Sequence, residues 1–175
     1  VSGKRKGPLA TLIRVGLSLA EIPYTFAVRI RNRHYDLVAT KSHRVSVPVI
    51  CIGNLTMGGT GKTPMVHFLA NLFQQRGIRM TIVSRGYRSA ADDRNDEAKE
   101  LSEKLPAVSH IQNPDRLAAA HQAIEKCNAQ VIVLDDGFQH RRLARDLDVV
   151  LIDALEPFGF GRVFPRGMLR EPVEG

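Results

Sequence analysis

The stretch that decides the fold is residues 53–63, which read Gly-Asn-Leu-Thr-Met-Gly-Gly-Thr-Gly-Lys-Thr. An apolar run over 47–52 predicts a buried strand before it, and the pattern over 62–76 predicts a helix that ends at Gly77. A glycine-rich turn between strand and helix, ending in Gly-Lys-Thr, matches the end of the phosphate-binding P-loop pattern. The first glycine of that pattern falls on Thr56, but the remaining glycines still allow a tight turn whose N–H groups point at phosphate oxygens.

This loop predicts a site for ATP and Mg²⁺. The helix that begins at Lys62 directs the positive end of its dipole at the same place as the loop N–H groups. Lys62 is long enough to reach the β- and γ-phosphates as a catalytic cation, and Thr63 offers a hydroxyl ligand to Mg²⁺. The expected nucleotide-binding residues are Thr56, Met57, Gly58, Gly59, Thr60, Gly61, Lys62 and Thr63.

A second motif, residues 131–136, reads Val-Ile-Val-Leu-Asp-Asp and predicts a strand that ends in two carboxylates. This is the Walker-B arrangement, in which a carboxylate holds Mg²⁺ directly or through water. Because the carboxyl ends of parallel strands lie at one edge of a sheet, we expect Asp135 and Asp136 beside the phosphate loop. Seen alone, the pair could instead cap a turn or helix, but together with the phosphate loop this alternative is not expected. His140 is a candidate contact for substrate or phosphate, although a single histidine is as often a structural hydrogen-bonding group.

The rest of the chain alternates between strand and helix patterns. Further strands are expected at 79–84, 107–111, 130–135 and 147–153, and further helices at 96–105 and 114–128. Such alternation predicts an α/β fold, a P-loop NTPase-like and mostly parallel sheet with helices on both faces.

The N-terminal part, residues 8–39, has apolar residues at helical spacing and predicts an amphipathic helix that precedes the sheet. Pro23 is expected to kink or divide it. Arg14, Glu21 and Arg29 interrupt the apolar residues, so a membrane-spanning helix is not expected. Two interpretations remain open: a helix that lies in a membrane interface, or one that packs on the domain's own core.

Composition and charge narrow the function classes. The 175 residues are 43% hydrophobic and 25% charged, which is typical of a globular protein, and two cysteines exclude a disulfide framework. Nine of the lysines and arginines, but only two acidic residues, lie within residues 1–44, so the net charge of +7 belongs to the N-terminal segment. This predicts an anionic partner at one end of the chain. We expect two parts, a basic amphipathic helical segment at 1–44 and a P-loop domain at 45–175.

Four blocks of sequence together resemble the tetraacyldisaccharide 4′-kinase family of lipid A biosynthesis. They are residues 53–64, residues 84–87 (Ser-Arg-Gly-Tyr), residues 135–147 (Asp-Asp-Gly-Phe-Gln-His, then Arg-Leu-Ala-Arg-Asp-Leu) and residues 165–172 (Pro-Arg-Gly-Met-Leu-Arg-Glu-Pro). The blocks occur in order across nearly the whole chain, and the second and fourth have no generic P-loop explanation. The resemblance implies transfer of the ATP γ-phosphoryl group to the 4′-hydroxyl of a lipid disaccharide 1-phosphate.

The same resemblance implies roles for individual residues. Arg85 and Tyr87 would contact the sugar phosphate of the substrate, and Glu171 would be a further active-site carboxylate. Asp135 and Asp136 would serve Mg²⁺ and the reacting phosphate, with Asp136 also in a catalytic role. The amphipathic helix would dock peripherally on the cytoplasmic face of the inner membrane.

The family's catalytic aspartate lies in a Gly-Asp-Glu-Pro stretch, and the nearest match here is Asn-Asp-Glu-Ala at 95–98. Asp96 is therefore the candidate base, with a helix cap as the alternative role. The family also has a C-terminal region with a histidine that assists this aspartate, and residues 1–175 do not include it. We expect the chain to be a fragment that lacks this lobe and is inactive as a kinase by itself.

Two other functions are consistent with parts of the sequence. A P-loop ATPase or GTPase of the metal-chaperone or partition type uses a similar loop, but usually has a lysine at the position that Met57 occupies here. A non-enzymatic module that binds nucleic acid would explain the basic N-terminus. Only 6% of the residues are aromatic, and no known nucleic-acid motif is recognised, so nucleic acid is not the expected partner.

Overall fold

The computed structural model describes residues 7–37, 42–59, 61–86 and 103–173. Its elements, in chain order, are α1 (Pro8–Leu37), β1 (Val49–Asn54), α2 (Lys62–Gln75), β2 (Met80–Ser84), β3 (Ser109–Gln112), α4 (Arg116–Cys127), β4 (Val131–Asp135), β5 (Leu147–Leu151) and the short 3-10 helix η3 (Gly159–Gly161). The predicted strands and the helices after the phosphate loop and before β4 are confirmed to within a few residues. The helix predicted at 96–105 lies almost entirely outside the described residues.

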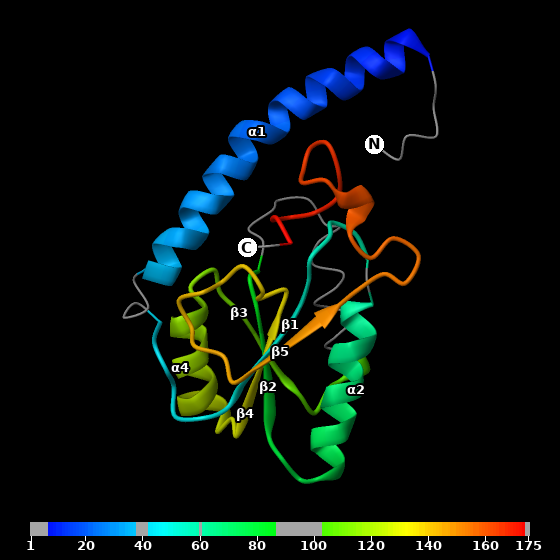
Figure 1. Ribbon diagram of the computed structural model, residues 1–175. Helices are drawn as coiled ribbons and strands as arrows, with labels where there is room; N and C mark the ends of the chain where they lie inside the picture. Colours follow the sequence, from blue (N-terminus) through cyan, green and yellow to red (C-terminus); the bar gives the residue numbers. More distant parts are fainter. Residues whose placement is uncertain (1–6, 38–41, 60, 87–102, 174–175) are drawn as a thin grey trace. The chain divides into compact units, whose positions relative to one another are not determined.

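The five strands form one sheet in the order β3-β2-β4-β1-β5. The pairs β1–β4, β2–β4 and β2–β3 are parallel, which confirms the predicted α/β class. Ile52 of β1 is in register with Asp135 of β4, so the strand before the phosphate loop lies beside the Walker-B strand. Figure 1 shows α2 and α4 on opposite sides of the sheet, as the strand–helix alternation predicts.

The core lies between the sheet and α4. Ile132 and Leu134 of β4 are fully buried, as are Ala119, Ala120 and Ala123 of α4. Strands covered on both faces read as continuous apolar runs, which is the pattern of β1 and β4. The small alanine side chains allow the α4 backbone to approach the sheet closely.

The start of α4 is fixed by its own sequence. Asp115 is the N-cap, and its Oδ1 accepts hydrogen bonds from the backbone N–H groups of Leu117 (3.0 Å) and Ala118 (3.3 Å). The helix expected at 114–128 would have put Asp115 in its first turn, but Asp115 is the N-cap, where an aspartate satisfies two N–H groups that have no partner within the helix. This cap places Arg116 at the first helical position.

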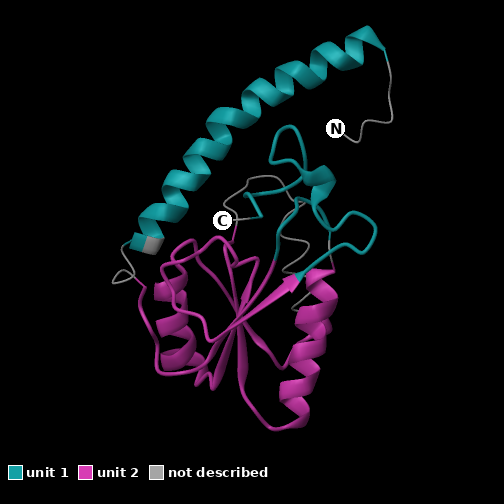
Figure 2. Cartoon of the chain, viewed as in Figure 1, with its two compact units in different colours: residues 1–39, 54–60, 151–175 teal, residues 40–53, 61–150 magenta. Residues whose placement is uncertain are grey.

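The chain divides into two compact units, which Figure 2 colours separately. The helix unit comprises residues 1–39, 54–60 and 151–175, and the sheet unit comprises residues 40–53 and 61–150. The boundary between them passes twice through the phosphate-loop region. The helix unit is therefore assembled from three pieces that are far apart in the sequence.

The structure corrects the expectation that Pro23 divides the N-terminal helix, because α1 continues from Pro8 to Leu37 through this residue. A proline inside a helix removes one backbone hydrogen bond. Contacts on both sides of it hold the helix in place: Glu21 Oε1 accepts from Val163 N at 2.9 Å, and the Tyr24 hydroxyl donates to Arg170 O at 3.1 Å.

A second correction concerns the hydropathy of α1. Arg14, Glu21 and Arg29 led to the expectation that this segment does not span a membrane. By length and composition alone, however, Pro8–Tyr35 is long and apolar enough to cross one. Only 6% of its most apolar window is buried. The large apolar side chains that lie exposed along α1 are Leu9, Leu12, Ile13, Val15, Leu19, Ile22, Phe26, Ile30 and Leu37. Exposed apolar side chains of this kind indicate that α1 has an apolar partner, and whether that partner is a membrane interface or a protein core stays a prediction.

Candidate nucleotide site

The N-terminus of α2 is built to receive an anion. Gly61 occupies the N-cap position with φ 82° and ψ 26°, a left-handed conformation that glycine adopts without strain. The cap makes no side-chain hydrogen bond, so the first N–H groups of the helix, those of Lys62 and Thr63, are not satisfied by a capping side chain. Their partial positive charge adds to that of the helix dipole.

Lys62 lies next to the end of the Walker-B strand. Its Nζ is 3.7 Å from Oδ1 of Asp136, and the Lys62 side chain is only 16% exposed. Asp136 has φ 51°, an unusual conformation for a residue with a side chain, which turns the chain sharply after β4. The structure thus brings together the cation and the carboxylate that the sequence singled out.

The turn after β4 needs a glycine at the end of β1. A Cβ atom added to Gly53 would lie 2.5 Å from Cβ of Phe138, closer than two such atoms approach. The chain after Asp136 therefore passes directly over Gly53. Backbone hydrogen bonds from Gly137 N to Ile52 O (3.3 Å) and from His140 N to Gly137 O (2.9 Å) hold this turn.

The first half of the loop, residues 54–59, belongs to the helix unit and is held by side-chain and backbone bonds. Asn54 is fully buried, and its Nδ2 donates to Thr56 O (2.6 Å) and Gly58 O (3.2 Å). Met57 N donates to Met168 O at 2.7 Å. Thr56 is also buried and forms an isolated antiparallel β-bridge with Leu169. Two of the predicted loop residues, Thr56 and Met57, are thereby fixed against the segment 168–169.

Glu171 makes contacts with α1. Its side chain is buried, and its Oε2 accepts a hydrogen bond from Nδ2 of Asn32 at 3.0 Å. Arg31 Nη2 lies 3.6 Å from the same oxygen. These contacts give the Glu171 carboxylate structural partners on α1, within the helix unit.

His140 lies among arginines. Burial, together with the positive charges of Arg116 and Arg142, lowers the pKa of His140 from 6.5 to about 4, although Asp115 acts in the opposite direction. Its ring is neutral at pH 7, and within the described part of the chain its buried Nε2 has no hydrogen-bond partner. The guanidinium groups around the ring, not the neutral imidazole, are what would attract an anionic ligand to this place.

Three residues near these motifs were not identified from the sequence. Arg116 is buried at the start of α4, Arg145 Nη1 donates to Phe138 O at 3.0 Å, and Asn54 holds the first half of the loop. The only sequence signal for Asn54 was its place directly after an apolar strand. Arg145 lay within the sequence block 142–147 that carries the family resemblance, whereas Arg116 had no sequence signal because its burial depends on the fold.

The remaining predicted residues are placed only in part. Arg85 follows β2 directly and is exposed. Tyr87, Asp96 and Thr60 lie outside the described residues. The expectation that Arg85 and Tyr87 contact the substrate phosphate therefore remains a prediction, as does the role of Asp96.

The donor set fits Mg²⁺. Among the described residues, no group of three His, Cys, Asp or Glu side chains forms a complete metal cage. Mg²⁺ does not need one, because it is commonly held by one or two carboxylates together with the substrate phosphates and water. Asp135 and Asp136 at the end of β4 and the hydroxyl of Thr63 supply the oxygen ligands that this ion prefers.

The comparisons with known proteins agree on one family. The model of LpxK, described as tetraacyldisaccharide-1-P 4′-kinase, matches residues 13–175. A tetraacyldisaccharide 4′-kinase of Anaeromyxobacter dehalogenans (strain 2CP-C) is 43% identical over 97% of this chain and 49% of its own length. One from Geobacter metallireducens is 40% identical over 94% of this chain and 54% of its own length.

A solved structure gives the same result. The crystal structure of LpxK from Aquifex aeolicus in complex with ATP matches with a TM-score of 0.82 at 35% identity, over 93% of this chain and 55% of that one. The chain spans about half the length of the curated relatives it matches. The interpretation as a metal-chaperone or partition ATPase finds no support in these comparisons.

Proposed function

Because the chain belongs to the tetraacyldisaccharide-1-P 4′-kinase family, we propose that it carries the ATP-binding part of a lipid kinase. The reaction is transfer of the ATP γ-phosphoryl group to the 4′-hydroxyl of a tetraacyldisaccharide 1-phosphate lipid. The proposal is carried by the position of Lys62 at the N-terminus of α2. Its Nζ lies 3.7 Å from Oδ1 of Asp136, the last residue of the Walker-B motif.

Phosphoryl transfer depends on positioning and on stabilisation of negative charge. Lys62 and the N–H groups at the start of α2 bind the terminal phosphates and offset the charge that develops on them. Thr63, Asp135 and Asp136 would hold Mg²⁺, which supplies further charge neutralisation when bound. Asp136 keeps Lys62 oriented, since the two side chains form an ion pair.

The acceptor side of the reaction is assigned by resemblance. Asp96 acts as the base that takes the proton of the 4′-hydroxyl, and Arg85, Tyr87, His140 and Glu171 bind the substrate. For His140, the neighbouring arginines Arg116 and Arg142 support a place beside an anionic group. For Glu171, the bond from Asn32 means that any substrate contact shares the carboxylate with α1.

The test is an assay of the intact protein with γ-labelled ATP, Mg²⁺ and the disaccharide lipid. Label is expected on the 4′-hydroxyl. Replacing Asp96 with alanine is expected to slow transfer by about 10²-fold or more while leaving ATP affinity unchanged, because a general base acts mainly in the transition state. ATP hydrolysis that ignores the lipid would reject the kinase, and a loss confined to ATP affinity would reject Asp96 as the base.

The same proposal includes the cellular setting. Residues 1–44 form a basic segment that docks peripherally on the cytoplasmic face of the inner membrane, and residues 45–175 form the P-loop domain. The exposed apolar side chains of α1 and the positive charge of its segment support this. Deleting residues 1–39 is expected to abolish sedimentation with anionic liposomes, and salt is expected to weaken binding of the parent. Equal binding by a soluble deletion variant would contradict the docking role.

A further inference from the structure

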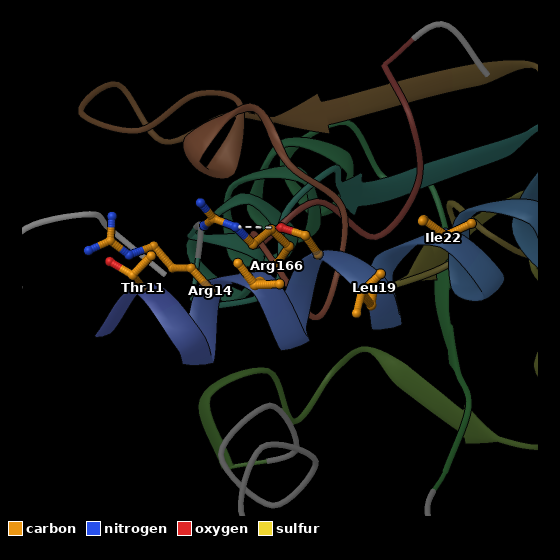
Figure 3. A pocket seen from close by; sticks show the side chains of 7 residues that line it. Thr11, Arg14, Leu19, Ile22 and Arg166 are labelled. Atoms are coloured by element: carbon orange, nitrogen blue, oxygen red, sulfur yellow. Dashed lines mark hydrogen bonds between the residues drawn. The ribbon is translucent and has the colours of Figure 1, made fainter. Parts of the chain in front are cut away.

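A hollow of about 360 Å³ lies along one side of α1, and Arg166 from the C-terminal part of the chain completes its lining (Figure 3). Most of its residues come from successive turns of the helix, three or four positions apart, so they share one face. The lining residues are Thr11, Arg14, Val15, Ser18, Leu19, Ile22 and Arg166.

One part of the hollow is positively charged. Arg14 Nε donates to Ala10 O at 3.1 Å, and Arg166 Nε donates to Ser18 Oγ at 3.2 Å, which is the dashed line in Figure 3. These bonds fix where two guanidinium groups lie, although the two arginines are far apart in the sequence. The seven lining residues include two cations and no acidic side chain. Both residues are half-buried, which strengthens the attraction for an anion compared with fully solvated charges.

The other part of the hollow is apolar and open. Val15 is 52% exposed, and Leu19 and Ile22 are each 64% exposed. Contiguous exposed apolar side chains beside fixed charges indicate an interaction surface rather than ordinary solvent-facing helix. An occupant that matches both parts has a phosphate group joined to a hydrocarbon chain.

We propose that this hollow binds the headgroup of an anionic membrane phospholipid. Arg14 and Arg166 bind the phosphodiester, because the guanidinium fork matches two phosphate oxygens, and the acyl chains lie over Val15, Leu19 and Ile22. The inference rests on the proposed docking of α1 on a membrane and adds which lipid it selects and through which residues. The hollow orients the helix on the surface, since a fixed headgroup contact defines which side of α1 faces the lipid.

The experiment compares binding of the intact protein to vesicles of phosphatidylcholine alone and of phosphatidylcholine mixed with phosphatidylglycerol. Arg14→Gln with Arg166→Gln is expected to weaken binding to the mixed vesicles by about tenfold or more, since each basic residue near an anionic surface contributes about fivefold. Binding to the neutral vesicles, which depends on the apolar face, is expected to change little.

A charge-conserving pair separates a built site from general attraction. Arg14→Lys with Arg166→Lys keeps both charges but loses the planar fork, so it is expected to lose most of the preference for phosphatidylglycerol. Arg33→Lys is the matched control, because Arg33 is exposed on α1 and does not line the hollow. The control is expected to bind as the parent does. If the lysine pair also binds as the parent does, the headgroup site is overturned.

The outcomes distinguish this inference from the proposal beneath it. If the parent binds neither kind of vesicle, the membrane role fails and the headgroup site fails with it. If the parent binds vesicles and every hollow variant binds equally well, membrane docking stands and the headgroup site is overturned. If the variants bind vesicles normally but raise KM for the disaccharide lipid, the hollow serves the substrate phosphate, which also overturns the inference.

Discussion

The sheet unit and the helix unit hold their candidate functional residues by different means. In the sheet unit, Lys62 and Asp136 meet because each follows a strand, and those strands are parallel neighbours in register. In the helix unit, Glu171 is held by a hydrogen bond from Asn32, a residue 139 positions earlier. Glu21 is likewise bonded to the backbone of Val163, 142 positions away.

The two units differ in how rigidly they hold these side chains. A phosphate site needs groups fixed to a fraction of an ångström, and a buried parallel sheet supplies that rigidity through backbone bonds and close packing. Along the described part of α1 a single apolar side chain, that of Val28, is buried, so this helix relies on single polar bonds. We therefore expect substitution of Lys62 in the sheet unit to affect mainly catalysis, and substitution of Asn32 in the helix unit to affect mainly stability.

The largest effect that would sharpen this comparison is on turnover. Lys62→Ala is expected to slow phosphoryl transfer by about 10²-fold or more, because one preorganised cation beside the terminal phosphates is lost. The free energy of unfolding is expected to change little, since the Lys62 side chain forms an ion pair and is not part of the apolar core. Steady-state assays with ATP and the lipid, together with urea unfolding, measure both quantities.

Lys126→Ala is the matched control for this change. Lys126 lies exposed in the last turn of α4 and is expected to keep parental turnover. Near-normal activity of the Lys62→Ala variant would reject the assignment of the phosphate loop. A large loss of stability instead of activity would remove the proposed division between the two units.

The same division explains what could be predicted from the sequence. The strands, α2 and α4 follow from local apolar periodicity and from glycine at helix ends, so their positions were predicted to within a few residues, whereas the N-cap role of Asp115 was not predicted. The approach of Lys62 to Asp136 also followed, because in a parallel sheet the ends of neighbouring strands meet at one edge. These are consequences of short-range patterns and one topological rule.

The helix unit was not predictable in this way. That α1 continues through Pro23 depends on contacts of Glu21 and Tyr24 with residues more than 140 positions away, and no local pattern encodes them.

Two features of the sheet unit were not predictable either. The burial of Arg116 and the depressed pKa of His140 arise only when distant segments pack together. Sequence reasoning treated His140 as a single histidine, whereas burial and the nearby Arg116 and Arg142 together lower its pKa.

A smaller effect tests the polar bonds of the helix unit. Asn32→Ala removes the donor to a buried carboxylate, and leaving Glu171 without that bond is expected to lower the free energy of unfolding by about 1–3 kcal/mol. The turnover number of the folded enzyme is expected to stay within a few-fold of the parent. Urea unfolding and kcat are the measurements, with Arg33→Ala as an exposed control on the same helix.

A double-mutant cycle makes this result specific. Glu171→Gln in the Asn32→Ala background is expected to cost less than Glu171→Gln alone, because the two side chains share one hydrogen bond. Additive effects would mean that the bond does not hold the helix unit together. A loss of kcat in Asn32→Ala without any loss of stability would move Glu171 and its partner to the active site.

The smallest expected effect concerns the charge surroundings of His140 in the sheet unit. Its pKa is about 4 in the folded protein and near 6.5 when solvated, so between these values the unfolded chain binds the proton more readily. The parent is therefore expected to lose stability relative to His140→Gln as the pH falls from about 6.5 to about 4, and to show no such loss above about 6.5. Because the His140 ring is partly solvated, we expect a difference in the free energy of unfolding of no more than about 1 kcal/mol.

Urea unfolding of both proteins at several pH values measures this difference. The other titrating groups cancel because both proteins contain them. Parallel stability curves across this range would mean that burial and the neighbouring arginines do not lower the pKa of His140 in the folded protein.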